Sequence, residues 1–330
     1  MNQPAPDVTG RVVRVDRGQC DVLTSNGVVR ASWRPTDAPT GGMPCTGDAV
    51  VVRLTDGPVV VDIAERHGSI VRSEVSPGSS GQQLLATNVD VVAICEPCHP
   101  KPNLSRLERM LALAWESGAE PVILMTKADL ADDLESILDD IAGLAFGVPV
   151  LPVTATTDGG LDAVQALAAE GKTLALLGRS GAGKSTLLNA LLGEEAMATR
   201  GLRADGRGRH TTTHRQMLVL PNGSFIIDTP GLKTVGLPSS EGLDRAFSDI
   251  EELAEACRFT DCSHRVEPGC AVLDAVDDGE LTQRRLDSYR KLLREAAYQA
   301  RRTDARLAAE ERARWKHLHQ DARRSARIRP

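Results

Sequence analysis

Residues 178–185, GRSGAGKS, match the pattern G-x-x-x-x-G-K-S of a loop that binds nucleotide phosphates. The glycines would let backbone N–H groups close around a β-phosphate, and the N-terminus of a following helix would add positive potential. Lys184 would reach the β- and γ-phosphates, and the Ser185 hydroxyl would bind Mg²⁺. A chance glycine-rich turn is the alternative. The apolar strand before the loop and the helical pattern after it favour a nucleotide site.

A second segment, TKAD at residues 126–129, ends another apolar run earlier in the chain. The Asp129 carboxylate could accept hydrogen bonds from guanine N1–H and the 2-amino group, neither of which adenine offers. The stem of Lys127 could cover the base, and the run Val153-Thr154-Ala155 could supply a backbone N–H to guanine O6. TKAD alone is a weak signal, but it lies at the sheet edge where ligands bind, and there it predicts a guanine nucleotide.

The segment FIIDTPG, residues 225–231, follows the phosphate loop. It puts Asp228 at the end of an apolar strand, where the carboxylate could hold Mg²⁺ through water, and Gly231 could follow the γ-phosphate. The polar, glycine-rich residues 200–215 lie between loop and strand and suit a switch segment that orders around the γ-phosphate and the metal. One of three consecutive threonines would contact Mg²⁺, and we favour Thr212.

The residue after Gly231 is Leu232, where Ras-like enzymes carry the glutamine that orients the attacking water. Leucine cannot orient water, so hydrolysis without a partner should be slow. His210, beside the threonines, is the nearest candidate for a helping group. A solvent-exposed loop histidine is an equally acceptable reading of His210 from sequence alone.

Four residues near the C-terminus, Cys257, Cys262, His264 and Cys270, have the spacing C-x₄-C-x-H-x₅-C. Three thiolates and one imidazole within 14 residues match a closed tetrahedral zinc site. Because the protein would fill all four positions, the metal would be structural. A rival pair, Cys95 and Cys98, is interpreted as structural or incidental, because it follows a buried strand of a parallel sheet and has no second ligand pair nearby.

The elements that must position these residues begin with a β-rich N-terminal region. Residues 10–72 hold five short β-rich runs, and turn signals such as SNG and DG separate them. This pattern predicts a small antiparallel barrel, with an OB-fold as the natural candidate. Such a barrel can bind single-stranded nucleic acid, but here Trp33 is the one aromatic residue available for stacking.

From about residue 88 the pattern changes to alternating strands and helices. Strands are expected at 89–94, 121–126, 149–154 and 173–178, and helices at 104–118, 134–145, 161–170 and 184–192. This alternation predicts right-handed βαβ units and a parallel sheet. The base-reading segment precedes the phosphate loop, whereas GTPases usually run in the opposite order. We therefore predict a circular permutation, which a parallel sheet tolerates because the strand positions need not change.

The composition is that of a soluble globular protein, with 41% hydrophobic and 25% charged residues among 330. We expect a cytoplasmic protein, because no signal peptide or run of about 18 apolar residues is present. Residues 282–330 carry fifteen Lys and Arg against six Asp and Glu, whereas the whole chain has a net charge of −6. This basic tail suggests contact with RNA, although a solvated helical face with Arg–Glu pairs explains the charges equally well.

Together, GRSGAGKST, TKAD, RHTTTHR, DTPG, the Cys-His spacing and the N-terminal barrel resemble the ribosome small-subunit-dependent GTPases, also called RsgA-like or YjeQ-like. The segment at 103–130 is also similar to that family, and the resemblance covers nearly the whole chain. It implies a GTP-hydrolysing factor of late small-subunit maturation. Such a factor binds the subunit and its rRNA in the GTP state, is stimulated by the subunit, and is released on hydrolysis. The chain departs from the common base-reading motif in having Thr126 where Asn is usual.

By motif position, the resemblance implies three sets of residues. The phosphate contacts would be Gly178, Arg179, Ser180, Gly181, Ala182, Gly183, Lys184, Ser185 and Thr186. The base contacts would be Thr126, Lys127, Ala128 and Asp129, with Thr154 and Ala155 added from the strand pattern. One structural Zn²⁺ per chain would be held by Cys257, Cys262, His264 and Cys270. The Mg²⁺ ligands, Ser185 and Thr212, come from the loop and switch patterns described above.

The expected architecture is a multidomain α/β protein. Residues 1–72 would form the OB-fold barrel, 73–240 the permuted P-loop GTPase domain, and 241–330 a helical zinc-binding domain with a basic tail. We expect a monomer that contacts no membrane. Two other functions stay open: an RNA-binding scaffold whose nucleotide is structural, and a permuted GTPase that acts on the large subunit. The intact Lys184, Ser185 and Asp228 favour an enzyme, because a scaffold has no need of magnesium ligands.

Overall fold

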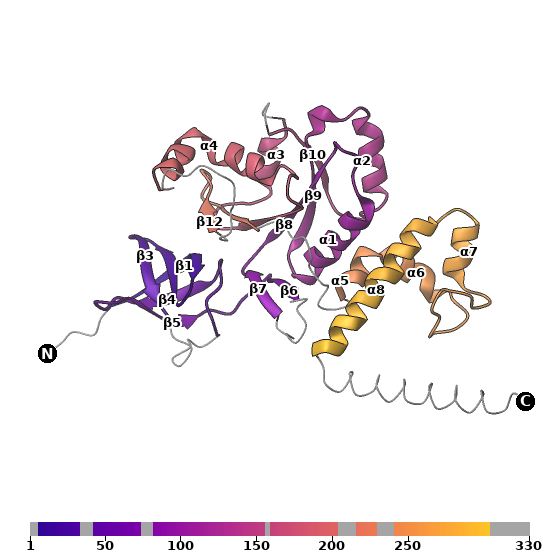
Figure 1. Ribbon diagram of the computed structural model, residues 1–330, viewed down its shortest axis with the longest axis horizontal. Helices are drawn as coiled ribbons and strands as arrows, with labels where there is room; N and C mark the ends of the chain where they lie inside the picture. The colour runs from indigo at the N-terminus through magenta and orange to yellow at the C-terminus, as the bar shows by residue number, and fades with distance from the viewer. Residues whose placement is uncertain are drawn as a thin grey trace, which may run out of the picture.

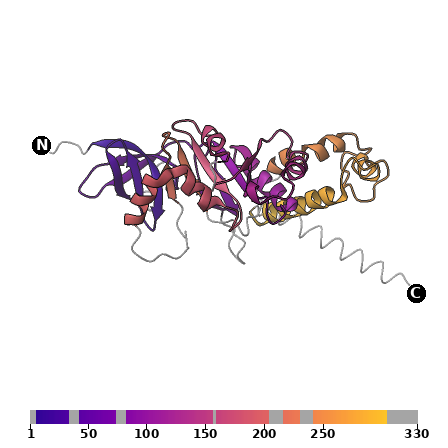
Figure 2. The ribbon, with the colours of Figure 1, turned by 90° about the horizontal axis from the view of Figure 1, so that it is seen from above.

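The computed structural model describes residues 6–33, 42–73, 82–155, 159–203, 216–229 and 241–303. The molecule has three parts in a row: an N-terminal β-barrel, a central α/β domain and a helical C-terminal part (Figures 1 and 2). Within the described ranges, no helix has both the length and the apolar character that crossing a membrane requires. Both nucleotide segments identified in the sequence lie in the central part.

The N-terminal part is a closed barrel of five strands. They are β1 (Asp7–Asp16), β2 (Gln19–Thr24), β3 (Gly27–Ser32), β4 (Ala49–Arg53) and β5 (Val59–Ile63). The strand order is β1-β2-β3-β5-β4, and β4 pairs back to β1 to close the barrel. All neighbours are antiparallel except β3 and β5, which pair in parallel. Alternate residues such as Val12, Val22 and Val52 fill the interior, which is the period-2 pattern of a one-sided strand. The predicted barrel is confirmed.

A short hairpin links the barrel to the central domain. It consists of β6 (Ile70–Ser73) and β7 (Gln82–Ala86), which pair antiparallel in a sheet of their own. Ile70 and Leu85 are buried in the same apolar cluster as the first helix of the central domain. This hairpin is absent from the sequence prediction, because its residues carry no clear alternation.

The central domain is built on a six-stranded portion of the main sheet. Its strands are β8 (Val91–Pro97), β9 (Glu120–Thr126), β10 (Val150–Val153), β11 (Thr173–Leu177), β12 (Gln216–Val219) and β13 (Phe225–Asp228). Their order is β10-β9-β8-β11-β13-β12, and all pairs are parallel except β12 with β13. The predicted parallel sheet is confirmed, with the antiparallel β12 as an addition.

Helices cover both faces of this sheet. They are α1 (Leu104–Glu116), α2 (Leu134–Ala142), α3 (Leu161–Ala166) and α4 (Lys184–Arg203), with a short 3₁₀ helix, η2 (Ala128–Leu130), after β9. α1 and α2 pack on one face, and α3 and α4 pack on the other. Gly193 interrupts α4 with non-helical backbone angles. The predicted end of this helix near residue 192 therefore marks a real break.

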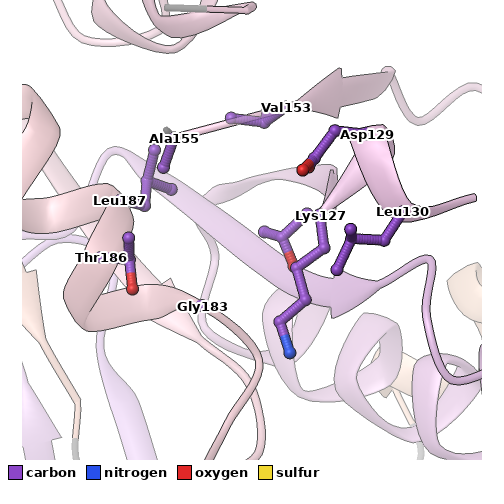
Figure 3. Close-up of a pocket in the computed structure, with 9 residues that line it drawn as sticks. Lys127, Asp129, Leu130, Val153, Ala155, Gly183, Thr186 and Leu187 are labelled. Carbon is purple, nitrogen blue, oxygen red and sulfur yellow. The ribbon is translucent and has the colours of Figure 1, made fainter. Parts of the chain in front are cut away.

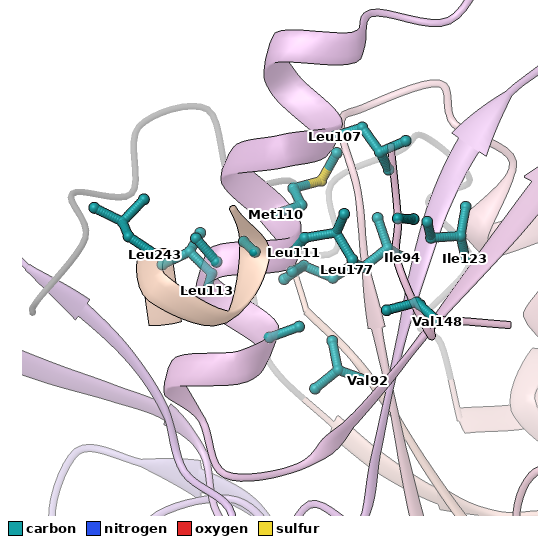
Figure 4. Packing of buried hydrophobic residues seen from close by; sticks show 14 of the residues in the cluster. Val92, Ile94, Leu107, Met110, Leu111, Leu113, Ile123, Val148, Leu177 and Leu243 are labelled. Carbon is teal, nitrogen blue, oxygen red and sulfur yellow. The ribbon is translucent and has the colours of Figure 1, made fainter. Parts of the chain in front are cut away.

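The core forms because β8 is apolar on both sides. Val92 and Ile94 face α1, while Ala93 and Cys95 face the opposite cluster. Helix α1 begins at an Asn103 cap, whose side chain accepts from the Arg106 N–H at 2.9 Å. Its buried face then packs on the sheet (Figure 4). This packing fixes β8 between β9 and β11, so that both nucleotide segments emerge at one edge.

The C-terminal part consists of α5 (Glu241–Ala246), α6 (Ser248–Glu255), α7 (Ala271–Asp277) and α8 (Gln283–Thr303). α5 lies so close to α1 that a Cβ on Gly242 would sit 2.2 Å from the carbonyl oxygen of Ala112. The Gly242 N–H also donates to Glu116 Oε2 at 3.1 Å. The helical part is therefore fastened directly to the central domain.

A buried ionic network makes a second connection between the central domain and the C-terminal part, because it joins α1 to α8. Glu108, which is fully buried, accepts hydrogen bonds from Arg284 and Arg285 at 3.0 Å. Arg285 also donates to Asp249 at 2.7 Å and to the carbonyl of Ala246 at 2.9 Å. Burial by itself would lower the pKa of Arg285, but Asp249 and Glu108 outweigh it, and the pKa is raised. Arg285 therefore stays charged.

The barrel joins the central domain through its first strand. β1 pairs with β12 at Arg14 and Gln216, so one continuous sheet runs through both parts. Arg11 donates to the Thr173 hydroxyl at 2.9 Å, and its guanidinium carbon lies 5.3 Å from the centroid of the Phe225 ring. These contacts attach the barrel near the starts of β11 and β13, at the edge opposite the nucleotide segments.

Candidate nucleotide site and metal centre

The candidate phosphate loop leaves the sheet after β11 and passes over the end of β8. A Cβ on Gly178 would lie 2.6 Å from the carbonyl oxygen of Cys95, so a side chain has no room there. Gly183 has a φ of 84° and leads directly into the first turn of α4. The loop thus ends at a helix N-terminus, where backbone N–H groups and the helix dipole favour an anion.

Lys184 is buried at the start of α4 and lies within the loop. Its Nζ donates to the carbonyl oxygens of Gly178 at 2.8 Å and of Arg179 at 3.0 Å. Burial lowers the pKa of Lys184, and the nearby carboxylate of Asp228 partly counteracts this. The side chain is therefore poised inside the loop, in the place where it would meet phosphate oxygens.

Asp228 ends β13, next to the end of β11, and is buried. The following hydroxyl, Thr229 Oγ1, donates to Leu176 O at 2.5 Å and fixes the chain against β11. Ser185 is exposed in the first turn of α4. A hydroxyl and a carboxylate beside a phosphate loop form an all-oxygen donor set that fits Mg²⁺, which binds oxygen ligands and usually keeps several waters.

A cavity of about 230 Å³ opens between the end of β9, the end of β10 and the first turn of α4 (Figure 3). Lys127 adopts the left-handed conformation, with a φ of 55°, and turns the chain into η2, which carries Asp129. The lining residues come from these elements: Thr126, Lys127, Asp129, Leu130, Val153, Ala155, Gly183, Thr186 and Leu187. Apolar walls with one carboxylate suit a flat base with ring N–H donors.

Thr126 has a role that the sequence does not reveal. Its hydroxyl donates to the carbonyl oxygen of Ala182 at 2.8 Å, and its side chain is almost fully buried. The residue that replaces the usual asparagine therefore joins the base cavity to the phosphate loop. No local pattern could have identified this contact, because its partners lie 56 residues apart.

Thr154 and Ala155, the two residues expected to offer an N–H to guanine O6, differ in the structure. The N–H of Thr154 donates to the carbonyl of Gly159 at 2.8 Å, so in this structure that N–H is already paired within the chain. Ala155 does line the cavity. Neither Thr154 nor Ala128 is among the described residues that line it. Leu130 and Leu187, which the sequence analysis missed, form apolar walls.

Three predicted site residues, His210, Thr212 and Gly231, lie outside the described residues. The same holds for Leu232 and for the basic tail beyond residue 303. Their proposed roles in magnesium binding, hydrolysis and RNA contact therefore stay predictions.

The four predicted zinc ligands come together in one cluster, in the segment that joins α6 to α7. The candidate ligand atoms of Cys257, Cys262, His264 and Cys270 all lie within 4.8 Å of one another. Cys257 Sγ is 3.9 Å from Cys270 Sγ, and His264 Nδ1 is 3.6 Å from Cys257 Sγ and 3.4 Å from Cys270 Sγ. Burial, with the neighbouring thiols of Cys262 and Cys257, raises the pKa of Cys270 to about 11.

These separations fit a tetrahedral zinc site. Zn–S bonds of about 2.3 Å and a Zn–N bond of about 2.0 Å would place two sulfurs about 3.8 Å apart, and a sulfur about 3.5 Å from a nitrogen. The donor set of three thiols and one imidazole also matches that of closed zinc sites. A bound cation would stabilise the Cys270 thiolate, which burial and the neighbouring thiols otherwise disfavour.

The CxxC pair formed by Cys95 and Cys98 does not belong to a cluster of this kind. Cys95 belongs to the apolar cluster under α3 and α4, and Cys98 to the cluster under α1. Burial raises the pKa of Cys95 to about 12 and that of Cys98 to about 11. Both thiols therefore favour the protonated form, which is a poor nucleophile and a poor metal ligand. This agrees with their interpretation as structural residues.

Comparison with protein families and named proteins identifies close relatives. A family model described as "RsgA GTPase" matches residues 63–238. "Small ribosomal subunit biogenesis GTPase RsgA" of Streptomyces avermitilis is 52% identical over 316 residues, which cover 94% of this chain and 85% of that protein. The protein of the same name from Methanosarcina acetivorans is 42% identical over 94% of this chain and 85% of its own length.

Solved structures support the same grouping. YjeQ from Thermotoga maritima superposes with a TM-score of 0.65 at 25% identity, over 88% of this chain and 99% of its own. YloQ, described as a circularly permuted GTPase, superposes with a TM-score of 0.62 at 25% identity, over 88% of this chain and 95% of its own. The predicted circular permutation, with β8 and β9 ahead of the phosphate loop in the chain but beside it in the sheet, is confirmed.

Proposed function

Because the chain belongs to the RsgA GTPase family and is a GTPase, we propose that it acts in late maturation of the small ribosomal subunit. In this proposal it binds the subunit and its rRNA in the GTP state, and hydrolysis releases it. The names of its relatives support the partner, since they describe small ribosomal subunit biogenesis GTPases. A factor with this partner would work in the cytoplasm.

One observation carries the nucleotide part of the proposal. The Thr126 hydroxyl bonds to Ala182 O, so the cavity that holds Asp129 and the loop that holds Lys184 are parts of one site. A guanine base in the cavity would put its N1–H and 2-amino donors toward the Asp129 carboxylate. The phosphates would then extend along the loop toward the N-terminus of α4. This arrangement favours an intact guanosine triphosphate over an isolated base or phosphate.

The roles of the chain's residues in hydrolysis follow from their positions. Lys184 would exchange its carbonyl partners for β- and γ-phosphate oxygens and neutralise charge that develops on them. Ser185 and Asp228 would hold Mg²⁺, with Thr212 as the proposed third group. Bound Mg²⁺ supplies charge neutralisation at the β- and γ-oxygens. Without a glutamine at position 232, orientation of the attacking water would depend on the ribosomal partner, with His210 as a candidate in this chain.

RNA contact is supported by basic residues of the C-terminal part. The side chains of Arg265, Arg290 and Arg294, with Asp287, line a surface cavity beside α8. Clustered guanidinium groups suit phosphodiester oxygens, which they can bind through two hydrogen bonds at once. The proposed monomer would present this surface, the barrel and the tail to the subunit together.

A direct test compares GTP and ATP hydrolysis by the purified chain alone, with small subunits and with large subunits. We expect slow turnover that is selective for GTP and rises strongly when small subunits are added. Stimulation by large subunits alone would favour the alternative partner. An RNA-binding scaffold with a structural nucleotide would instead show no turnover under any of these conditions.

Replacement of Asp129 by Asn tests the base assignment. The variant loses the carboxylate that would accept from both guanine donors, at a cost of about 1.5–3 kcal/mol, or roughly 10- to 100-fold in GTP affinity. The affinity for xanthosine triphosphate should rise, because the Asn amide can donate a hydrogen bond to the 2-carbonyl oxygen of xanthine. Affinities would be measured by competition with a fluorescent GDP. Asp132→Asn makes the same charge change at an exposed position and should leave the preference for GTP intact.

We also propose that Cys257, Cys262, His264 and Cys270 hold one structural Zn²⁺ per chain. Cys262→Ala removes one thiolate and should lower the zinc content below one per chain, measured by mass spectrometry of the metal. It should also destabilise the helical part, because metal-binding free energy contributes to folding. Cys20→Ala, in the barrel core, should keep a full zinc content. A fully loaded and equally stable Cys262→Ala would remove this residue from the site.

A further inference from the structure

The loop between the candidate ligands His264 and Cys270 is organised around the carboxylate of Glu267, whose hydrogen bonds go to other residues of the loop. Glu267 Oε1 accepts hydrogen bonds from the backbone N–H of Ser263 at 3.1 Å and from the Ser263 hydroxyl. Its Oε2 accepts from the N–H groups of Arg265 at 2.8 Å and Val266 at 3.0 Å. One side chain thus binds the backbone on both sides of His264.

His264 itself has an unusual backbone conformation. Its φ is 54°, in the left-handed region that residues with a Cβ seldom adopt unless their surroundings hold them there. The carbonyl of His264 accepts a hydrogen bond from Arg290 on α8, which fixes the turn from the other side. In this conformation the Nδ1 atom faces the thiols of Cys257 and Cys270 at 3.6 and 3.4 Å.

The direction of the imidazole and the conformation of the loop are therefore linked. A change of residue 264 to a negative φ would turn its Cα–Cβ bond and carry Nδ1 away from the three sulfurs. Such a change would have to break the hydrogen bonds that the Glu267 carboxylate accepts from the N–H groups of residues 263, 265 and 266. The carboxylate is well suited to prevent it, because it accepts hydrogen bonds at both oxygens and donates none.

We propose that Glu267 is a positioning residue of the zinc site: together with Arg290 it holds His264 in the left-handed turn that directs Nδ1 at the metal. This inference rests on the zinc site proposed above. Glu267 acts through the ligand's backbone and does not itself touch zinc. Groups that orient metal ligands in this way commonly affect metal affinity by about 10- to 100-fold.

Glu267→Gln tests the proposal with little change in size. The variant replaces one acceptor oxygen by an NH₂ group, which cannot accept, so either the Ser263 N–H or the Arg265 and Val266 N–H groups lose their partner. Zinc release from the full chain to the indicator 4-(2-pyridylazo)resorcinol should become about 10- to 100-fold faster. Glu280→Gln is the matched control, because it removes the same charge from an exposed residue just before α8 and should release zinc at the wild-type rate.

A second measurement distinguishes the loss of His264 as a metal ligand from a general destabilisation of the zinc-binding loop. Co²⁺-loaded wild-type protein should show the strong visible absorption of a tetrahedral site with three sulfurs and one nitrogen. Glu267→Gln should weaken and shift this absorption as His264 leaves the metal. Basal GTP turnover, which depends on the central domain, should stay unchanged in both Glu→Gln variants.

The outcomes distinguish this inference from the zinc site on which it rests. Wild-type protein without zinc would overturn both. Zinc-loaded wild type, with Glu267→Gln releasing zinc no faster than Glu280→Gln, would overturn the role of Glu267 alone. If Glu267→Gln cannot be isolated with metal, Ser263→Ala decides, because it removes only the hydroxyl donor to the same carboxylate. It should release zinc at a rate above that of the control, and a rate equal to the control would overturn the proposal.

Discussion

Lys184→Ala is expected to reduce GTP turnover by at least about 10²–10³-fold, the usual cost of removing one preorganised group that stabilises transition-state charge. The structure gives the reason, since Nζ is held inside the loop by Gly178 and Arg179 and alanine leaves no cation there. Turnover should be measured at saturating GTP with small subunits present, so that weaker binding does not hide the effect on the chemical step.

Lys172→Ala is the matched control for this experiment. Lys172 lies just before β11 in the same domain, but its ammonium is exposed and pairs with Asp90 at 2.8 Å on the surface. Turnover by that variant should stay close to wild type, because exposed ion pairs contribute little. Retained turnover in Lys184→Ala would mean that residues 178–185 do not bind the phosphates.

The second large effect is expected from Arg285→Met. This change leaves Glu108 and Asp249 without their main buried partner, and breaking a buried ion pair from one side typically costs about 3–5 kcal/mol. The guanidinium also lies 4.5 Å from the centroid of the Phe247 ring, a contact that methionine replaces only in part. Urea denaturation followed by circular dichroism should show earlier loss of the helical C-terminal part.

Two comparisons make the result specific. Arg53→Met removes an arginine whose pair with Asp7 is exposed, and it should hardly change the unfolding transition. The double variant Glu108→Gln with Arg285→Met should recover part of the lost stability, because it removes a charge that the single variant leaves uncompensated. An Arg285→Met protein that unfolds like wild type would mean that the network does not hold α8 to α1.

The sequence predicted the features whose chemistry is local. A phosphate loop needs glycines at fixed positions before a helix, and a zinc site needs four ligands at short spacing, so GRSGAGKS and the Cys-His cluster could be read directly. The alternation of apolar strands and amphipathic helices likewise predicted the sheet. The base segment was predicted because Asp129 follows a strand at the edge where ligands bind.

The features that the sequence did not reveal depend on contacts between distant residues. Thr126 bonds to Ala182 across 56 positions, and Glu108 meets Arg285 across 177. The residues that neighbour Thr126 and Glu108 in the sequence do not indicate these distant partners. The hydrogen bond from the Thr154 N–H to Gly159 was not foreseen either, because it closes a turn whose geometry the sequence pattern does not specify. Strand β12 was missed because QMLV is short and lacks clear alternation.

The close contact of α5 with α1 also limits how this chain can change in evolution. Any residue other than glycine at position 242 would put its Cβ against the backbone of α1, whatever residue occupies position 112, because the obstacle there is a carbonyl oxygen. A compensating substitution on α1 cannot remove that obstacle. Position 242 should therefore tolerate substitution as poorly as a residue of the nucleotide site, although it has no part in the chemistry.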